Sequence, residues 1–267
     1  MAFVPNSIIT LTTDFGLDDP FAAIMKGVIL SVNPKARIVD ITHGVPAHDI
    51  LAGAMALQSS CSHFPKGTIH LAVVDPGVGS SRRPLLAVCD HHAFVGPDNG
   101  LLSPSMQSQK GVQVIHLTQE AFFVKPVSQT FHGRDIFAPV AAWLSLGKLP
   151  ESFGPVIDDW IRLDWPVPRR VGESLFGTVL RVDRFGNLIT NISAADLARS
   201  TTATEVIEIT IKGRTIRRFC RSYSEAVSNE PFAIIGSAGL LEISVRQASA
   251  AALLGAGPRE EFEVRVL

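Results

Sequence analysis

The chain has 267 residues, of which 46% are hydrophobic, and a mean hydropathy of +0.25. These values exclude a disordered protein and predict a large core, most simply divided between two domains. The 24 Lys and Arg residues nearly balance the 25 Asp and Glu residues, which argues against a nucleic-acid or membrane partner and favours a small molecule.

Short apolar or β-branched runs alternate with segments of helical period from residue 8 to about residue 147. This alternation predicts a parallel or mixed sheet covered by helices. One helix is expected after Pro20 and ends before Pro34, and a second runs from Asp49 to about Ser60. The expected strands are Ile8–Thr13, Arg37–Ile41, Thr68–Val74, Leu85–Val88, Ala93–Val95 and Gln113–Leu117.

The composition of the sequence changes after Gly147. The segment 163–174 (LDWPVPRRVGES) is rich in Pro and Arg. We therefore expect an α/β domain with a central, mostly parallel sheet and flanking helices over residues 1–165, a linker over 166–171, and a smaller β-rich, barrel-like domain over 172–267. The strand-like runs of the second domain are 174–183, 187–193, 205–219, 232–245 and 261–267.

The three cysteines, Cys61, Cys89 and Cys220, are widely separated and lack CxxC spacing, so neither a disulfide framework nor a zinc site is indicated. The opening residues lack the basic and long apolar stretches of a signal peptide. No later run approaches the roughly 18 apolar residues that a membrane span requires. These features predict a cytoplasmic protein.

Asp14 is the first candidate site residue, because the motif TTDFG ends an apolar strand in a carboxylate and a glycine. Ligands of open α/β sheets bind beyond the carboxyl ends of the strands, so Asp14 could bind a hydroxylated ligand. The alternative is that Asp14 caps the helix that begins near Pro20.

The motif VVDPGVGSSRR supplies a second candidate, in which Asp75 and Arg82 could pair across a loop. Gly77 and Gly79 would let this backbone approach a ligand, although Asp-Pro-Gly is also ordinary turn chemistry. The phosphate-binding pattern GxxxxGK[ST] and the dinucleotide pattern GxGxxG are absent, which disfavours nucleoside triphosphates and NAD.

The motif TFHGRD places His132 just before a segment of helical character. A helix N-terminus favours the neutral imidazole, which suits a base or a hydrogen-bond acceptor. Two other histidines, His43 and His48, lie near acidic residues, but no HExxH or HxH motif accompanies them and no metal ion is expected. The motif GPDNG favours a structural turn.

Polar groups also gather at two expected strand ends of the second domain, over residues 183–187 (DRFGN) and 237–242 (SAGLLE). Either segment alone could be a turn. Together they form a candidate second face for a ligand.

Seven motifs in this order resemble the S-adenosyl-L-methionine hydrolases (adenosine-forming), also called hydroxide adenosyltransferases. The resemblance covers roughly residues 8–255 and implies a homotrimer with active sites between subunits, acting on S-adenosyl-L-methionine without a cofactor. The fluorinases and chlorinases share this fold. The motifs are TTDFG, DITHGVP, VVDPGVGSSRR, GPDNGLL, FHGRD, DRFGNLITNI and SAGLLEI.

The resemblance implies a catalytic set of Asp75, Arg82 and His132. The halogenases carry tyrosines where Asp75 and His132 stand, and the fluorinases add an inserted loop that this chain lacks. The substrate contacts that the resemblance implies are Asp14 to the ribose, Asp183 and Ser237 to the methionine, Asn187 and Tyr223 near the adenine, and Gly133.

Hydrolysis at C5′ needs an aimed and deprotonated water but no general acid, because the sulfonium leaves as a neutral thioether. We predict that His132 receives the proton or orients the water, that Asp75 fixes it, and that Arg82 keeps Asp75 ionised. The alternatives are a chlorinase-type halogenase and a non-catalytic sensor of S-adenosyl-L-methionine or adenosine.

Overall fold

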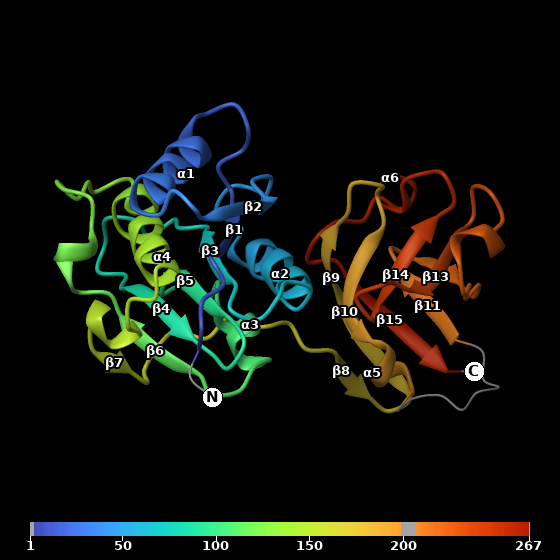
Figure 1. Cartoon of the computed structure of the whole chain (residues 1–267). Helices are drawn as coiled ribbons and strands as arrows, with labels where there is room; N and C mark the ends of the chain where they lie inside the picture. The colour runs from blue at the N-terminus through green and yellow to red at the C-terminus, as the bar shows by residue number, and fades with distance from the viewer. Residues whose placement is uncertain (1–2, 199–206, 267) are drawn as a thin grey trace. The chain divides into compact units, whose positions relative to one another are not determined.

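The computed structural model describes residues 3–198 and 207–266 and contains two compact units, Met1–Asp164 and Trp165–Leu267 (Figure 1). Each unit has its own hydrophobic core. Residues 205, 206 and 267, at the ends of two expected strands, lie outside the described residues. The segment expected as a linker contributes strand β8 (Arg169–Val171), which pairs with β9 (Ser174–Val182).

The N-terminal unit is built on a mixed sheet with the strand order β2-β1-β3-β5-β4-β6-β7. The pairs among β2, β1, β3 and β5 are parallel, and the remaining pairs are antiparallel. The α/β prediction is confirmed, and the sheet is mixed, with three parallel and three antiparallel pairs, where a mostly parallel sheet was expected. The strands are β1 (Ile8–Thr13), β2 (Arg37–Thr42), β3 (Ile69–Val73), β4 (Pro84–Val88), β5 (Ala93–Pro97), β6 (Gln113–His116) and β7 (Val156–Ile157).

Helices cover both faces of this sheet (Figure 1). Helices α1 (Phe21–Val32) and α4 (Ala138–Ser145) pack over one face, where Ile9 and Leu11 of β1 join their core. Helices α2 (Ile50–Cys61) and α3 (Ser103–Gln107) lie on the other face. Among the described residues, every helix is too short or too polar to span a bilayer.

The parallel pairing of β1 with β3 sets the position of the site. Thr13 is the register partner of Val73, so both strands end at the same edge of the sheet. Asp14 directly follows the first strand, and Asp75 follows the third after one further residue. Two sequence motifs separated by some 60 residues therefore converge, as expected for the carboxyl ends of parallel strands.

The C-terminal unit is a curved sheet with the order β12-β11-β15-β9-β10-β14-β13. Its two ends meet, because the backbone N–H of Cys220 donates to the carbonyl of Ala233 at 2.8 Å and Ala233 N–H donates to Arg218 at 2.8 Å. The barrel-like prediction is confirmed. Its remaining elements are β10 (Leu188–Ser193), α5 (Ala194–Ala198), β11 (Ile207–Ile211), β12 (Arg214–Ile216), β13 (Pro231–Ile235), β14 (Leu240–Val245), α6 (Ala250–Leu254) and β15 (Glu261–Val266).

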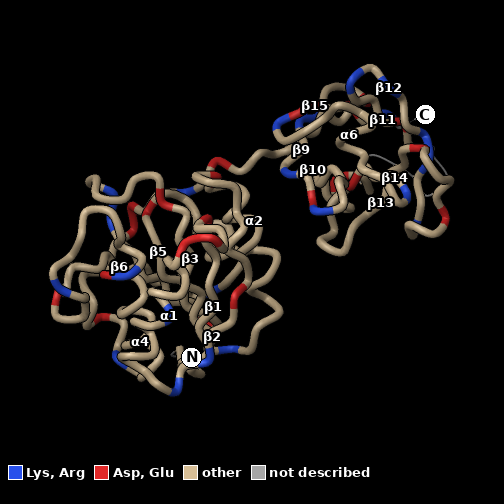
Figure 2. Tube along the Cα trace, turned by 90° about the horizontal axis from the view of Figure 1, so that it is seen from above, with Lys and Arg blue, Asp and Glu red and all other residues tan. Residues whose placement is uncertain are grey.

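Acidic and basic residues are interspersed along both units (Figure 2). This distribution agrees with the nearly balanced net charge of −1.

Candidate functional site

A cavity of about 250 Å³ opens at the sheet edge where β1 and β3 end. Asp14, Asp75, His132 and Gly133 all line it. The structure thus brings together four of the site residues predicted in the N-terminal half. Three carry polar side chains, and they come from three separate segments of the chain.

Arg82 joins the two candidate catalytic side chains of this cavity. Its Nε donates to Asp75 Oδ1 at 3.1 Å and its Nη2 donates to Asp75 Oδ2, which is the pairing expected from the loop motif. The same Nη2 lies 3.0 Å from His132 Nδ1. The side chains of Arg82 and Asp75 are only 6% and 5% exposed, so bulk water screens this pair weakly.

The contact from Arg82 fixes the protonation of the imidazole. Arginine has no acceptor atom, so His132 Nδ1 must accept this hydrogen bond and cannot carry a proton. In the neutral ring the proton therefore resides on Nε2. As arranged here, His132 can donate a hydrogen bond through Nε2 but cannot accept a proton there.

The electrostatics of the site agree with this assignment. Burial lowers the pKa of His132, and the Arg82 guanidinium lowers it further, so the imidazole is held neutral. Burial raises the pKa of Asp75 above its ordinary value even though Arg82 acts in the opposite direction. A carboxylate with a raised pKa is a stronger base than an ordinary one.

His132 precedes a π-helical turn, Gly133–Phe137, that continues into α4. The sequence predicted the helical character of this region but not the widened first turn. π-helical turns are rare and frequent at functional sites.

Asp14 does not cap a helix. Its Oδ2 accepts a hydrogen bond from the backbone N–H of His48 at 2.9 Å, whereas α1 begins after Pro20 without a side-chain cap. The ligand-facing alternative is therefore the one that the geometry supports. His48, at a φ of 66°, was not anticipated as a partner of this carboxylate.

Gly79 holds the loop of Arg82 against the segment that leads to His132. Its φ is +78°, and a Cβ atom at this position would lie 2.3 Å from the carbonyl oxygen of Gln129. Only glycine permits this approach. The second glycine of the DPGVG motif thus has a positional role that its sequence context alone did not specify.

Three phenylalanine rings form an apolar wall of the same cavity. Phe15, Phe21 and Phe131 pack against one another with ring centroids 5.3 to 5.9 Å apart. This cluster was not predictable from the sequence, because the three residues lie in different segments of the chain. Such a wall excludes water from one side of the polar groups.

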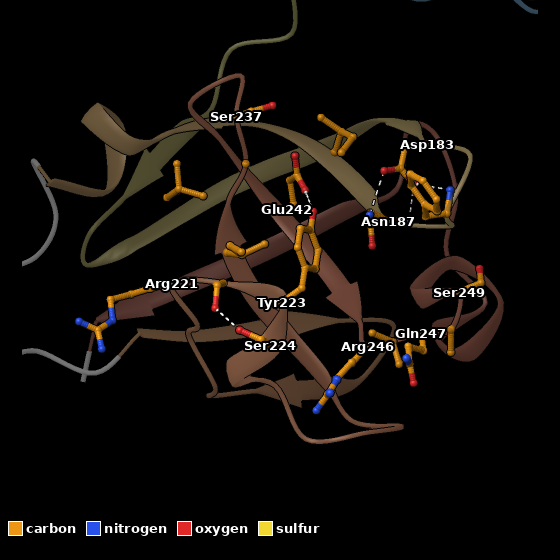
Figure 3. Close-up of a pocket in the computed structure, with 18 of the residues that line it drawn as sticks. Asp183, Asn187, Arg221, Tyr223, Ser224, Ser237, Glu242, Arg246, Gln247 and Ser249 are labelled. Carbon is orange, nitrogen blue, oxygen red and sulfur yellow. Dashed lines mark hydrogen bonds between the residues drawn. The ribbon is translucent and has the colours of Figure 1, made fainter.

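The other predicted substrate contacts line a cavity of about 1110 Å³ in the C-terminal unit (Figure 3). Asp183 Oδ1 accepts hydrogen bonds from the backbone N–H groups of Phe185 and Asn187, and its Oδ2 accepts one from Asn187 Nδ2, each at 2.9 Å. Asp183 therefore builds the turn and also orients Asn187. Ser237 and Tyr223 line the same cavity.

The histidines considered for a metal serve other contacts. His43 Nδ1 pairs with Thr13 Oγ1 at 2.8 Å, and its Nε2 lies 3.2 Å from Asp40. Over residues 3–198 and 207–266, no group of three or more His, Cys, Asp or Glu side chains is arranged to hold a metal ion.

Comparison with known proteins identifies two matching family domains. Residues 9–154 match the SAM hydroxide adenosyltransferase N-terminal domain, and residues 177–263 match the C-terminal domain of the same family. The chain is 36% identical to the (R)-S-adenosyl-L-methionine hydrolase of Salinispora tropica over 264 residues, which cover 97% of this chain and 98% of that protein.

A more distant relative and a solved structure are also similar to most of this chain. A fluorinase from an Actinoplanes species is 26% identical over 222 residues, covering 73% of this chain and 74% of the fluorinase. A crystal structure of an uncharacterized conserved protein from Thermotoga maritima superposes with a TM-score of 0.89 at 33% identity, covering 97% of this chain and 99% of that chain. Because both domains match, the chain belongs to the SAM hydroxide adenosyltransferase family.

Proposed function

We propose that this chain hydrolyses S-adenosyl-L-methionine to adenosine and L-methionine by in-line attack of water on C5′. The observation that carries the proposal is the hydrogen-bonded set Asp75, Arg82 and His132 at a cavity that also contains Asp14. Relatives 35–36% identical over nearly the whole chain are named hydrolases of the (R) epimer, so we propose that epimer as the preferred substrate.

Asp75 is the proposed base. A carboxylate with a pKa near 4 is a weak base towards water, but burial raises the pKa of Asp75 and Arg82 keeps the group oriented. The Nε2–H of His132 would donate to the water oxygen and aim it. Of the two roles expected for His132 from the sequence, this arrangement supports the orienting one.

The reaction balances without a further reactant. The water oxygen forms a bond to C5′ while the C5′–S bond breaks. The electron pair of the broken bond stays on sulfur and gives the neutral thioether of methionine. The released proton passes to Asp75 and then to solvent. Arg82 Nη1 is buried and has no hydrogen-bond partner among the described residues, so this guanidinium keeps one unused donor beside Asp75 and His132.

The substrate contacts implied by the family are divided between the cavities of the two structural units. In this proposal the N-terminal cavity takes the ribose and the reacting carbon, and the C-terminal cavity takes the methionine and adenine groups. We propose a homotrimer in which one subunit supplies the first cavity and a neighbour supplies the second, in the cytoplasm. The assigned residues are Asp14 and Gly133 in the first cavity, and Asp183, Ser237, Asn187 and Tyr223 in the second.

The test incubates the full chain with separated (R) and (S) epimers, a chelator and chloride, and resolves the products by chromatography. Equal amounts of adenosine and methionine, formed faster from the (R) epimer, would support the proposal. Formation of 5′-chloro-5′-deoxyadenosine would indicate a halogenase. Calorimetric binding without turnover would indicate a sensor.

A further inference from the structure

Glu242 is a buried carboxylate beneath the C-terminal cavity, and none of the roles above uses it. It lies on β14, is 8% exposed, and lines the cavity with Asp183. Burial raises the pKa of Glu242, although the hydrogen bond from Tyr223 acts in the opposite direction. The charge of Arg181, which lines the same cavity, offsets part of the cost of this burial.

The hydrogen-bond partner of Glu242 is Tyr223. The phenol hydroxyl donates to Glu242 Oε2 at 2.9 Å, and Figure 3 shows the two side chains meeting in the middle of the cavity lining. Tyr223 lies on a short 3₁₀ turn, Tyr223–Glu225, and remains 46% exposed. Loss of the hydrogen bond to its hydroxyl would therefore leave the ring less restricted on this short turn.

A second contact completes the orientation of the ring. Tyr223 packs edge-on against the buried Phe232 of β13, with ring centroids 6.0 Å apart. The hydroxyl is thus fixed by β14 and the ring edge by the neighbouring strand. One face of the tyrosine is left as part of the cavity wall.

Gly236 preserves the space that the carboxylate needs. A Cβ atom at this position would lie 1.8 Å from Glu242 Oε1 and 2.3 Å from its Cδ. A side chain at position 236 would therefore displace the Glu242 carboxylate from the position it holds in the hairpin between β13 and β14. Gly236 thus leaves room for the carboxylate that accepts the hydrogen bond from Tyr223.

We infer that Glu242 is a positioning residue that holds the Tyr223 ring as a fixed wall for the flat base of the substrate. The inference rests on the proposed function, because it assigns the adenine of S-adenosyl-L-methionine to this cavity. Glu242 acts through Tyr223 and does not touch the reacting atoms. Its effect falls on the affinity for the adenosine moiety and not on the chemical step.

Adenosine binding to the full chain, measured by calorimetry, tests this inference without requiring turnover. Tyr223→Phe removes the hydroxyl and Glu242→Leu removes the acceptor, and each should weaken adenosine binding about 3- to 10-fold. The double variant should bind no worse than either single variant, because both changes remove the same hydrogen bond. Glu242→Gln keeps an acceptor oxygen and should restore most of the affinity.

Glu225→Gln is the matched control, since Glu225 lies in the same turn but bonds Arg221 instead of Tyr223. It should leave adenosine binding unchanged. Losses that add in the double variant, or an unchanged affinity in Glu242→Leu, would overturn the inference. A wild-type chain that binds adenosine and releases none from S-adenosyl-L-methionine would instead count against the proposed function alone.

A spectroscopic signal separates this role from a general loss of structure. Tyr223 is the one tyrosine of the chain, so tyrosinate absorbance reports on it alone. Burial and the hydrogen bond to Glu242 raise its pKa to about 12. At about pH 11 the absorbance should be low in the wild type and higher in Glu242→Leu, with near-ultraviolet circular dichroism showing that both remain folded.

Discussion

Arg82 Nη2 donates a hydrogen bond to His132 Nδ1 at 3.0 Å, across 50 residues of sequence. The same nitrogen bonds the Asp75 carboxylate. One guanidinium group thereby sets the tautomer of the histidine and the orientation of the aspartate. The assignment of base and donor follows from this contact.

Substitution of His132 separates hydrogen-bond donation from proton acceptance. A Gln amide can reach the position of Nε2 and donate an N–H to water, whereas an Asn amide reaches only the position of Nδ1. We expect His132→Gln to keep kcat within about tenfold of the wild type and His132→Asn to lose roughly 100-fold. Equal losses of kcat in the two variants would argue against the donor role.

The pH dependence of kcat/KM identifies the base. Activity requires the Asp75 carboxylate, so it should fall as the pH drops through a pKa that burial has raised above 3.8. Arg82 lowers that pKa, so in Arg82→Gln the acid limb should move to higher pH. His132→Gln should retain the limb. If the acid limb were absent in His132→Gln, the base would be His132 and not Asp75.

Gly79→Ala should separate the loop of Arg82 from the segment of His132, because the added Cβ meets the carbonyl of Gln129. We expect a loss of about 1–3 kcal/mol in the free energy of unfolding and a decrease in kcat of more than about tenfold. Gly147→Ala is the control. Gly147 has a φ of +84°, but an added Cβ would meet nothing within 4 Å, so kcat should be unchanged. Similar kcat losses in both would show that backbone strain alone is responsible.

His70 should make the N-terminal unit sensitive to acid. It is buried between Phe64 and Phe94, and burial lowers its pKa to about 3. Below about pH 6.5 the unfolded chain binds a proton that the folded chain cannot bind. The free energy of unfolding should therefore fall by up to about 1.4 kcal/mol per pH unit between about pH 6 and pH 3.

Denaturant titrations at several pH values measure this dependence. His70→Asn should reduce the slope, and His91→Asn, at an exposed histidine, should leave it unchanged. An unaltered slope in His70→Asn would mean that another group titrates.

Local sequence patterns predicted most elements of the N-terminal unit. Strand β1 and helix α1 match their expected ranges, because alternation and one-sided apolar spacing are local signals. The pairing of Asp75 with Arg82 was also predictable, since one short loop carries both residues.

Contacts between distant segments were not predictable in this way. The approach of Gly79 to Gln129, the bond from His48 to Asp14 and the ring cluster around Phe131 depend on the folded arrangement of loops. Glu242 stood in a motif identified from the sequence, but the sequence carried no sign that Tyr223 would bind it.

The central claim is tested most directly by measuring adenosine released from (R)-S-adenosyl-L-methionine by the wild type, Asp75→Asn and Asp158→Asn. Asp75→Asn removes the proposed base with little change in shape, and Asp158 is an exposed carboxylate of the same unit. We predict adenosine and methionine in equal amounts from the wild type and from Asp158→Asn, and a rate lower by about 100-fold or more in Asp75→Asn. No adenosine from the wild type, or an undiminished rate in Asp75→Asn, would contradict the account.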